Sequence, residues 1–187
     1  DLESIDKTNL EIRQALSIDP NEIVIGNIAR LDYQKDPIKF INIAKEIISK
    51  SDKNYKFVLI GSGTLENQVK KMVEDFSMQK HFIFTGFIEN VEPYFSIFDA
   101  FLITSKYEGL PVTAIKAISC KSLIFGFEVN GMKDLNNIFT TVFLTKTRNT
   151  ENMADLIIEK FENINSLKFF LEKNSQKARQ EFYIDNM

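Results

Sequence analysis

The sequence predicts an α/β fold with a doubly wound, mostly parallel, Rossmann-like sheet of about six strands and helices on both faces. Short apolar runs rich in Ile, Val and Phe recur along the 187 residues, and most are apolar on both faces, as in a buried parallel strand. Stretches with apolar residues at helical spacing separate these runs. No internal repeat or linker interrupts the alternation, so residues 1–187 are expected to form a single domain.

The elements follow one another in a regular order. The first twenty residues predict a short amphipathic helix that carries Leu10, Ile12 and Leu16 and ends at Asp19-Pro20. The strands that follow are expected at Ile23–Ile28, Lys56–Ile60, Phe82–Phe84, Ala100–Ile103, Leu123–Phe125 and Val142–Leu144.

Helices are expected between the strands. The clearest starts at Pro37, because Asp36 is a good N-cap and proline suits the first helical position. A second apolar stripe runs from Leu65 to Phe76, and further helices are expected at 111–119, 151–162 and 166–182.

Composition excludes several classes of function. The net charge is −3 and no basic block exists, which argues against nucleic-acid binding. Cys120 is the single cysteine, so no intramolecular disulfide forms, as in a reducing compartment. Apolar runs stay far below the ~20 residues of a membrane helix, and no signal peptide is present, so a cytoplasmic location is expected. No His/Cys cluster predicts a metal site, and no nucleophile–His–acid set can be assembled.

Ligands of such sheets bind at the carboxyl ends of the strands. The loops that lie there in this sequence are Gly26–Lys35, Gly61–Gly63, Thr85–Phe87, Ser105–Pro111 and Glu128–Gly131. The residue types that bind anions and sugars gather in these loops.

Arg30 and Lys35 lie on the first of these loops. Arginine offers a planar fork for phosphate oxygens and lysine a compact charge, so the pair could clamp a diphosphate without a metal. The alternative is that both are solvated surface charges.

Glycines mark the next two loops. Gly61 permits positive φ and close approach of a ligand, or else serves only a tight strand-to-helix turn. A full G-x-G-x-x-G is lacking, which argues against an ordinary dinucleotide site. Gly86 gives room for a planar base at the backbone of Phe87, whose side chain could instead pack in the core.

Glu108 and Gly109 follow the fourth strand, where backbone N–H groups and a helix N-terminus favour an anion. Glu108 could accept hydrogen bonds from sugar hydroxyls or hold Lys35. The alternative is an exposed loop acid.

The loop Glu108-Gly109-Leu110-Pro111 resembles the E-G-L-P loop of the retaining glycosyltransferases of family four (group 1), and other parts match in order from about residue 20 to 145. The chain is similar to the C-terminal, donor-binding domain of these GT-B enzymes. The resemblance implies a nucleotide diphosphate-sugar, expected to be a UDP-sugar, as the donor.

The resemblance also implies roles for single residues. Arg30 and Lys35 would bind the diphosphate, with Gly26 and Gly61 at the neighbouring strand ends. Gly86 and Phe87 would lie near the base, and Glu108 near the donor sugar. The amides of Gly109 and Leu110 would approach the phosphates. Arg30, Lys35 and Glu108 are the residues expected to take part in catalysis.

One departure concerns Lys116, which stands where the family's E-x7-E motif has its second Glu, the residue that grips the ribose diol. Lysine can only donate hydrogen bonds, so it is expected to seek phosphate or Glu108 and to give weak dependence on the ribose diol. The segment Ser119–Ser122 also departs from the family pattern. These departures keep open a catalytically silent GT-B domain that acts as a binding or partner subunit. A nucleotide-sugar epimerase fits the E-G-L-P loop less well.

The resemblance finally implies a longer protein. The sequence starts with Asp rather than Met, and an N-terminal domain that holds a saccharide or lipid-linked acceptor is expected to be absent. The isolated chain is expected to be inactive. The full-length enzyme would act in bacterial polysaccharide or capsule synthesis, in peripheral association with the inner face of the membrane.

Overall fold

A computed structural model describes residues 2–182, with side chains from residue 8 onward, and contains a six-stranded sheet. The strand order is β3-β2-β1-β4-β5-β6, and all neighbours are parallel. The predicted fold class is therefore confirmed, and predicted strand ends differ from the observed ones by at most two residues, as at Gly86. The strands are β1 (Ile23–Ile28), β2 (Tyr55–Ile60), β3 (Phe82–Gly86), β4 (Ala100–Ile103), β5 (Leu123–Phe127) and β6 (Val142–Thr145).

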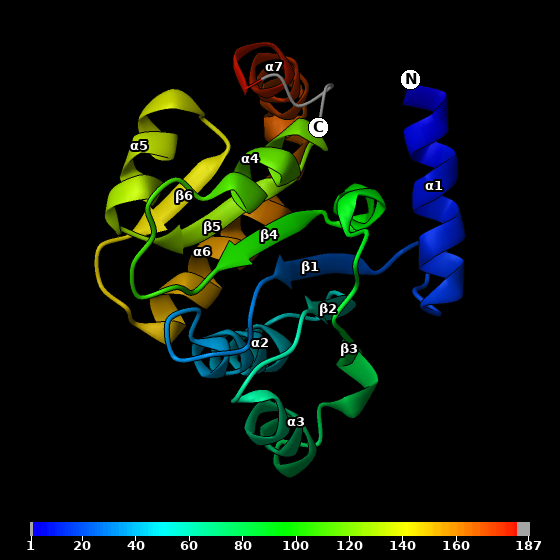
Figure 1. Cartoon of the computed structure of the whole chain (residues 1–187), viewed down its shortest axis with the longest axis vertical. Helices are drawn as coiled ribbons and strands as arrows, with labels where there is room; N and C mark the ends of the chain where they lie inside the picture. Colours follow the sequence, from blue (N-terminus) through cyan, green and yellow to red (C-terminus); the bar gives the residue numbers. More distant parts are fainter. Residues whose placement is uncertain (1, 183–187) are drawn as a thin grey trace.

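The strand order reverses at β1, which pairs with β2 on one side and with β4 on the other (Figure 1). The chain after β1 enters a helix on one face, and the chain after β4 enters a helix on the other. A crevice between the two departing loops is where a parallel sheet of this kind binds ligands.

Helices cover both faces of the sheet, as predicted (Figure 1). They are α1 (Leu2–Ala15), α2 (Pro37–Lys50), α3 (Glu66–Asp75), α4 (Val112–Ser119), α5 (Asn130–Ile138), α6 (Thr150–Glu162) and α7 (Ile164–Phe182), with 3-10 turns η1 (Gln79–His81) and η2 (Glu92–Ile97).

Helix α5 and the two 3-10 turns were not predicted. The α5 segment contains one glycine and three asparagines, which are poor helix formers, and its N-cap Val129 makes no side-chain capping bond. Burial of Met132 and Leu135 against the sheet stabilises this helix instead. Tertiary packing thus decided the conformation that local propensity did not indicate.

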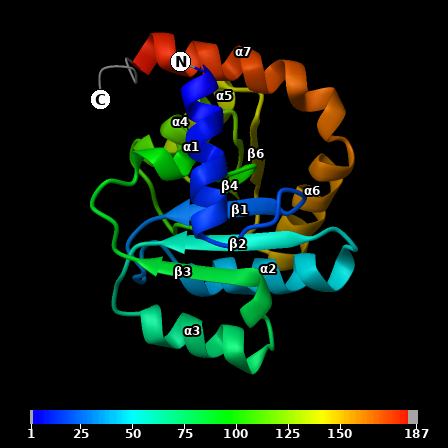
Figure 2. The ribbon, with the colours of Figure 1, turned by 90° about the vertical axis from the view of Figure 1, so that its right-hand side faces the viewer.

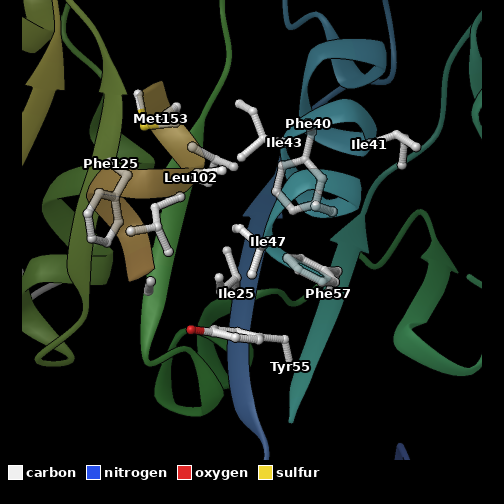
Figure 3. Close-up of a cluster of buried hydrophobic side chains, with 14 of the residues drawn as sticks. Ile25, Phe40, Ile41, Ile43, Ile47, Tyr55, Phe57, Leu102, Phe125 and Met153 are labelled. Atoms are coloured by element: carbon white, nitrogen blue, oxygen red, sulfur yellow. The ribbon is translucent and has the colours of Figure 1, made fainter. Parts of the chain in front are cut away.

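Alternate strand residues feed two hydrophobic cores, one on each face. Ile25 and Phe57 face the core formed with α2, α3 and α6, where Phe40 meets Phe57 edge to face (Figure 3). Val24 and Val58 face the second core, formed with η2, α4 and α5. Burial on both faces explains why these strands are apolar throughout rather than alternating.

The terminal helices extend both cores. Helix α7 runs across the top of the molecule in Figure 2, with Leu167 and Leu171 against the first core and Ala178 in the second. On α1, Ile12 packs against the second core as expected. Leu10 does not, because its side chain is exposed, so its predicted place on the apolar face was wrong.

Candidate functional site

Three loops meet at the carboxyl edge of the sheet, after β1, β4 and β5. The amide of Lys106 donates to the Gln34 carbonyl at 2.9 Å, which joins the β1 and β4 loops. The amide of Gly131 donates to the Glu108 carbonyl at 3.3 Å, which joins the β4 loop to the start of α5. The backbone therefore holds the three predicted ligand loops in one unit.

Lys35 and Glu108 form an ion pair in this unit, with 2.7 Å between Nζ and Oε1. Their side chains are 25% and 11% exposed, so the pair is partly shielded from water. The prediction that Glu108 could hold Lys35 is confirmed. An ammonium and a carboxylate thus lie in contact at the carboxyl edge of the sheet, on the loops after β1 and β4.

The backbone of Lys35 is held on both sides. Its amide donates to Asp32 Oδ1 at 3.1 Å, and its carbonyl accepts from Thr104 Oγ1 at 2.9 Å. The next residue, Asp36, has φ 50° and ψ 58°, the left-handed region that non-glycine residues seldom occupy. Its side chain caps α2 by accepting from the Lys39 amide, as predicted.

Arg148 enters the same unit from the loop between β6 and α6. Its Nη2 donates to Asp36 Oδ2 and to the Thr104 carbonyl, both at 2.7 Å. Its Nη1 donates to the Ser105 carbonyl at 2.8 Å, and the guanidinium lies over the ring of Phe127 at 4.4 Å. One side chain therefore connects α2, the end of β4 and the end of β5.

A pocket of about 290 Å³ lies beside this unit, at the carboxyl ends of β1, β2 and β3. Ala29 and Arg30 line it, and they also line a cavity of about 10 Å³ whose wall includes Lys35 and Thr104. Arg30 therefore lines both the pocket and the small cavity beside Lys35. The other residues that line the pocket are Ile28, Ile60, Gly61, Ser62, Phe87, Ile88, Glu89 and Val91.

Gly61 lines the pocket, and Gly86 directly precedes the lining residue Phe87. Gly61 has φ +132°, and a Cβ there would lie 2.0 Å from the Ala29 carbonyl oxygen, so the tight turn alone requires glycine. Gly86 has φ +71° with open space around it. Phe87 is 76% exposed, so the alternative that its side chain packs in the core was wrong.

Arg30 is the most accessible cation of the site, with 74% of its side chain exposed. It contacts Asp32, with 3.1 Å between Nη2 and Oδ2. An exposed pair of this kind contributes little to stability, so Arg30 is free to change partner when an anion approaches.

The Gly109-Leu110 segment presents backbone donors. Within residues 8–182, neither amide donates a hydrogen bond to another protein group. Gly131 packs against this segment, because a Cβ at Gly131 would lie 1.5 Å from the Gly109 carbonyl oxygen. The N-terminus of α4 follows directly, so the loop can accommodate an anion.

Gly26 lies in the buried interior of β1 rather than in a loop. A Cβ there would meet the ring of Phe98 at 2.1 Å, so close packing of the second core already explains the glycine.

Lys116 does not contact Glu108. It lies on α4 and pairs with Glu92 of η2, one residue beyond Val91 of the pocket wall. The expectation that Lys116 could seek Glu108 was wrong, because Lys35 occupies that carboxylate and Glu92 offers a nearer one.

Other chemistry is absent from the part of the chain that the structure describes. No group of three or more His, Cys, Asp or Glu side chains there could hold a metal ion, and no helix is long and apolar enough to cross a membrane. Burial raises the pKa of the Cys120 thiol above its ordinary value, against an opposing hydrogen bond from Ser119. The thiol is therefore protonated at neutral pH and is a poor nucleophile.

The sequence did not predict the place of Arg148. Its loop, 146–149, follows the sixth strand and was not among the predicted ligand loops. The signal was available, since the carboxyl end of every parallel strand lies on the same edge of the sheet. Which carbonyls the guanidinium would reach depends on tertiary contacts.

The sequence of the chain matches the family described as glycosyl transferases group 1 over residues 8–178. It is 27% identical over 143 residues to a poly(ribitol-phosphate) alpha-N-acetylglucosaminyltransferase of Staphylococcus aureus. The aligned residues make up 76% of this chain and 29% of that protein. It is 31% identical over 111 residues to an alpha-1,4-N-acetyl-D-galactosaminyltransferase of Campylobacter jejuni, with 58% and 30% covered.

Solved structures share the fold. The crystal structure of Anabaena HepE in complex with UDP-glucose has a TM-score of 0.80 at 19% identity, covering 94% of this chain and 49% of that one. The glycosyltransferase WaaG, described as involved in lipopolysaccharide biosynthesis, has a TM-score of 0.82 at 11% identity, covering 93% and 47%. At these identities the likeness concerns the fold alone.

This chain thus spans about a third to a half of the length of such relatives. The family match and the GT-B-type sheet agree with each other. The chain belongs to the group 1 glycosyltransferases.

Proposed function

We propose that this chain is the donor-binding domain of a retaining glycosyltransferase that takes its sugar from a UDP-sugar. The observation that carries the proposal is the pocket of about 290 Å³, whose lining residue Arg30 also lines the small cavity beside Lys35, the partner of Glu108. An apolar pocket next to a cationic clamp matches a nucleotide, which has a flat base at one end and a charged diphosphate beyond it.

In this proposal the donor lies along the carboxyl edge of the sheet. The base lies in the pocket, against Phe87 and the backbone at Gly61 and Gly86. Arg30 and Lys35 bind the diphosphate by charge-assisted hydrogen bonds, and the amides of Gly109 and Leu110 add donors. These groups supply positive charge and hydrogen-bond donors to the leaving diphosphate.

Glu108 faces the donor sugar in this proposal. When the diphosphate binds Lys35, the Glu108 carboxylate loses part of its interaction with the ammonium and becomes available to sugar hydroxyls. Lys35 and Arg30 stabilise the negative charge that develops on the leaving group, which is the catalytic contribution proposed for them.

The acceptor would be a saccharide or a lipid-linked group held by an N-terminal domain outside this chain. Large apolar side chains are exposed on the loops around Glu108, at Tyr33, Tyr107 and Leu110, and such a face is suited to covering by another domain. The names of relatives include a diphosphoundecaprenol-linked acceptor and a poly(ribitol-phosphate) acceptor. They support a role in bacterial polysaccharide synthesis at the inner face of the membrane.

A second candidate is a catalytically silent domain that binds a partner or a nucleotide. The observation that favours it is that position 116 carries a lysine, paired with Glu92, in place of a carboxylate. Sugar transfer by the full-length protein excludes this candidate, whereas nucleotide binding without transfer or donor hydrolysis supports it.

Calorimetric titration of UDP into the purified chain tests the proposed site. Charge-assisted bonds contribute roughly 1.5–3 kcal/mol each, so Arg30→Ala and Lys35→Ala should each weaken UDP binding about tenfold or more. Uridine binding should change much less. Equal UDP affinities for the wild type and both variants would overturn the proposal.

A further inference from the structure

We infer that Arg148 is a positioning residue for the diphosphate clamp. The inference rests on the proposed function and deepens it, because Arg148 would act through Lys35 and the Glu108 loop without touching the donor. No motif of the sequence singled out this residue.

The hydrogen bonds of Arg148 all end in the two loops that carry Lys35 and Glu108. Nη2 contacts Asp36, the residue directly after Lys35, and also the carbonyl of Thr104. The hydroxyl of Thr104 in turn donates to the Lys35 carbonyl at 2.9 Å. Arg148 is therefore connected to the Lys35 carbonyl through Thr104 and to the following residue through the Asp36 side chain, along two separate routes.

The route through Asp36 involves a residue in an unusual conformation. Asp36 is held in the left-handed region, at φ 50°, where an L residue gains no stability from its backbone alone. Its Oδ1 caps α2 at the Lys39 amide, and its Oδ2 accepts from Arg148. A residue that is held from both carboxylate oxygens can retain this conformation, and the turn at Asp36 determines where Lys35 projects.

The β4 loop is fixed at the same time. Nη1 donates to the Ser105 carbonyl at 2.8 Å, three residues before Glu108. The ring of Phe127 lies against the guanidinium at 4.4 Å and limits its movement. Arginine suits this place because its rigid fork serves three acceptors at once, which a lysine ammonium on a flexible stem does less well.

Arg148 itself is not placed as a ligand of the donor. Its charge is balanced by Asp36 at 2.7 Å, and its described donors point at protein acceptors. Arg148 is not among the residues that line the pocket. Loss of Arg148 should therefore affect the diphosphate end of the donor and leave the base end unchanged.

The test compares UDP with uridine, by calorimetry and by NMR titration. In R148Q the UDP affinity should fall about tenfold, while the uridine affinity should stay within about twofold of wild type. R148K should lie between wild type and R148Q, because it keeps the charge but not the fork. Circular dichroism and thermal unfolding would establish that each variant is folded. If R148Q does not fold, the comparison of UDP with uridine is made with R148K instead.

K50Q is the matched control. Lys50 also joins α2 to α6, through Asp155 at 2.7 Å, but it lies at the far end of α2 from Lys35. This variant removes a more exposed ion pair that also contacts α2, and it should change neither affinity. A double variant adds a readout that a general stability loss would not move: R148Q/K35A should bind UDP as weakly as K35A alone.

The outcomes separate the two proposals. A wild-type chain that binds UDP no more tightly than uridine overturns the proposed function, and the inference with it. A wild-type preference for UDP, with equal losses of both ligands in R148Q or with additive losses in the double variant, overturns the inference alone.

Discussion

The two halves of the carboxyl edge are built differently. Over β1, β4 and β5 the loops are joined by backbone hydrogen bonds, and Arg148 and the Lys35–Glu108 pair tie them together. Over β2 and β3 the pocket wall includes the Gly61 turn, Ile88, Val91 and the exposed ring of Phe87. The first half is a site of paired charges, and the second is a largely apolar wall whose turns are joined by backbone hydrogen bonds, such as that from the Gly61 amide to the Gly86 carbonyl at 2.8 Å.

The difference has a physical reason. Charged groups bind an anion well only if they are already in place, since reorganising them costs much of the interaction. A flat base needs surface and room more than directed bonds, so an exposed aromatic ring suffices. Substitutions in the first half should therefore affect stability and binding together, whereas substitutions in the second should affect binding alone.

The largest effect is expected for Gly131→Ala. A Cβ would lie 1.5 Å from the Gly109 carbonyl oxygen, so the loop that carries Glu108 must move. We expect a loss of about 2–3 kcal/mol in the free energy of unfolding, the upper range for overpacking, measured by urea denaturation. Gly109→Ala is the control, because no atom lies within 4 Å of a Cβ there, and equal losses for both would contradict the account.

A smaller loss is expected for Glu108→Ala, which leaves the partly shielded ammonium of Lys35 without its carboxylate. We expect about 1–2 kcal/mol in the same assay, below the range for a fully buried pair because water reaches Lys35. Glu151→Ala removes an exposed partner of Lys50 and should change stability by less than about 0.5 kcal/mol. An equally small effect of Glu108→Ala would mean that the Lys35–Glu108 pair does not hold the charged half in place before a ligand binds.

Phe87→Ala tests the apolar half. The ring is 76% exposed, so its loss should leave the unfolding free energy within about 0.5 kcal/mol of wild type. Stacking of a base on an aromatic ring contributes roughly 1–3 kcal/mol, so UDP affinity should fall at least about fivefold. Thermal unfolding and calorimetry on the same samples measure both. A large drop in stability, or unchanged UDP affinity, would remove the distinction between the halves.

The smallest effect concerns the ribose. Lys116 offers only donors and is paired with Glu92, so neither is free to grip a diol. UDP and 2′-deoxy-UDP should bind within about threefold, which is under ~0.7 kcal/mol. Competition calorimetry measures the ratio. A preference of more than tenfold for UDP would mean that the ion pair opens when the nucleotide binds.

The six strands, with ends within two residues of the observed ones, could be predicted from the amino-acid pattern alone, and so could the loops expected to bind the ligand. Strands buried on both faces read as continuous apolar runs, and Asp36-Pro37 marked the start of α2, because these features depend on neighbours in the chain. Arg30, Lys35 and Glu108 could be selected because strand ends of a parallel sheet share one edge.

Which of these residues contact one another depends on how the elements pack in three dimensions. Glu108 pairs with Lys35 rather than with Lys116. Arg148 contacts Asp36, which lies 112 residues before it in the sequence. Helix α5 forms despite weak propensity because Met132 and Leu135 are buried. Packing on the sheet positions these side chains relative to one another, and side-chain contacts across the fold have no local pattern from which they could be predicted.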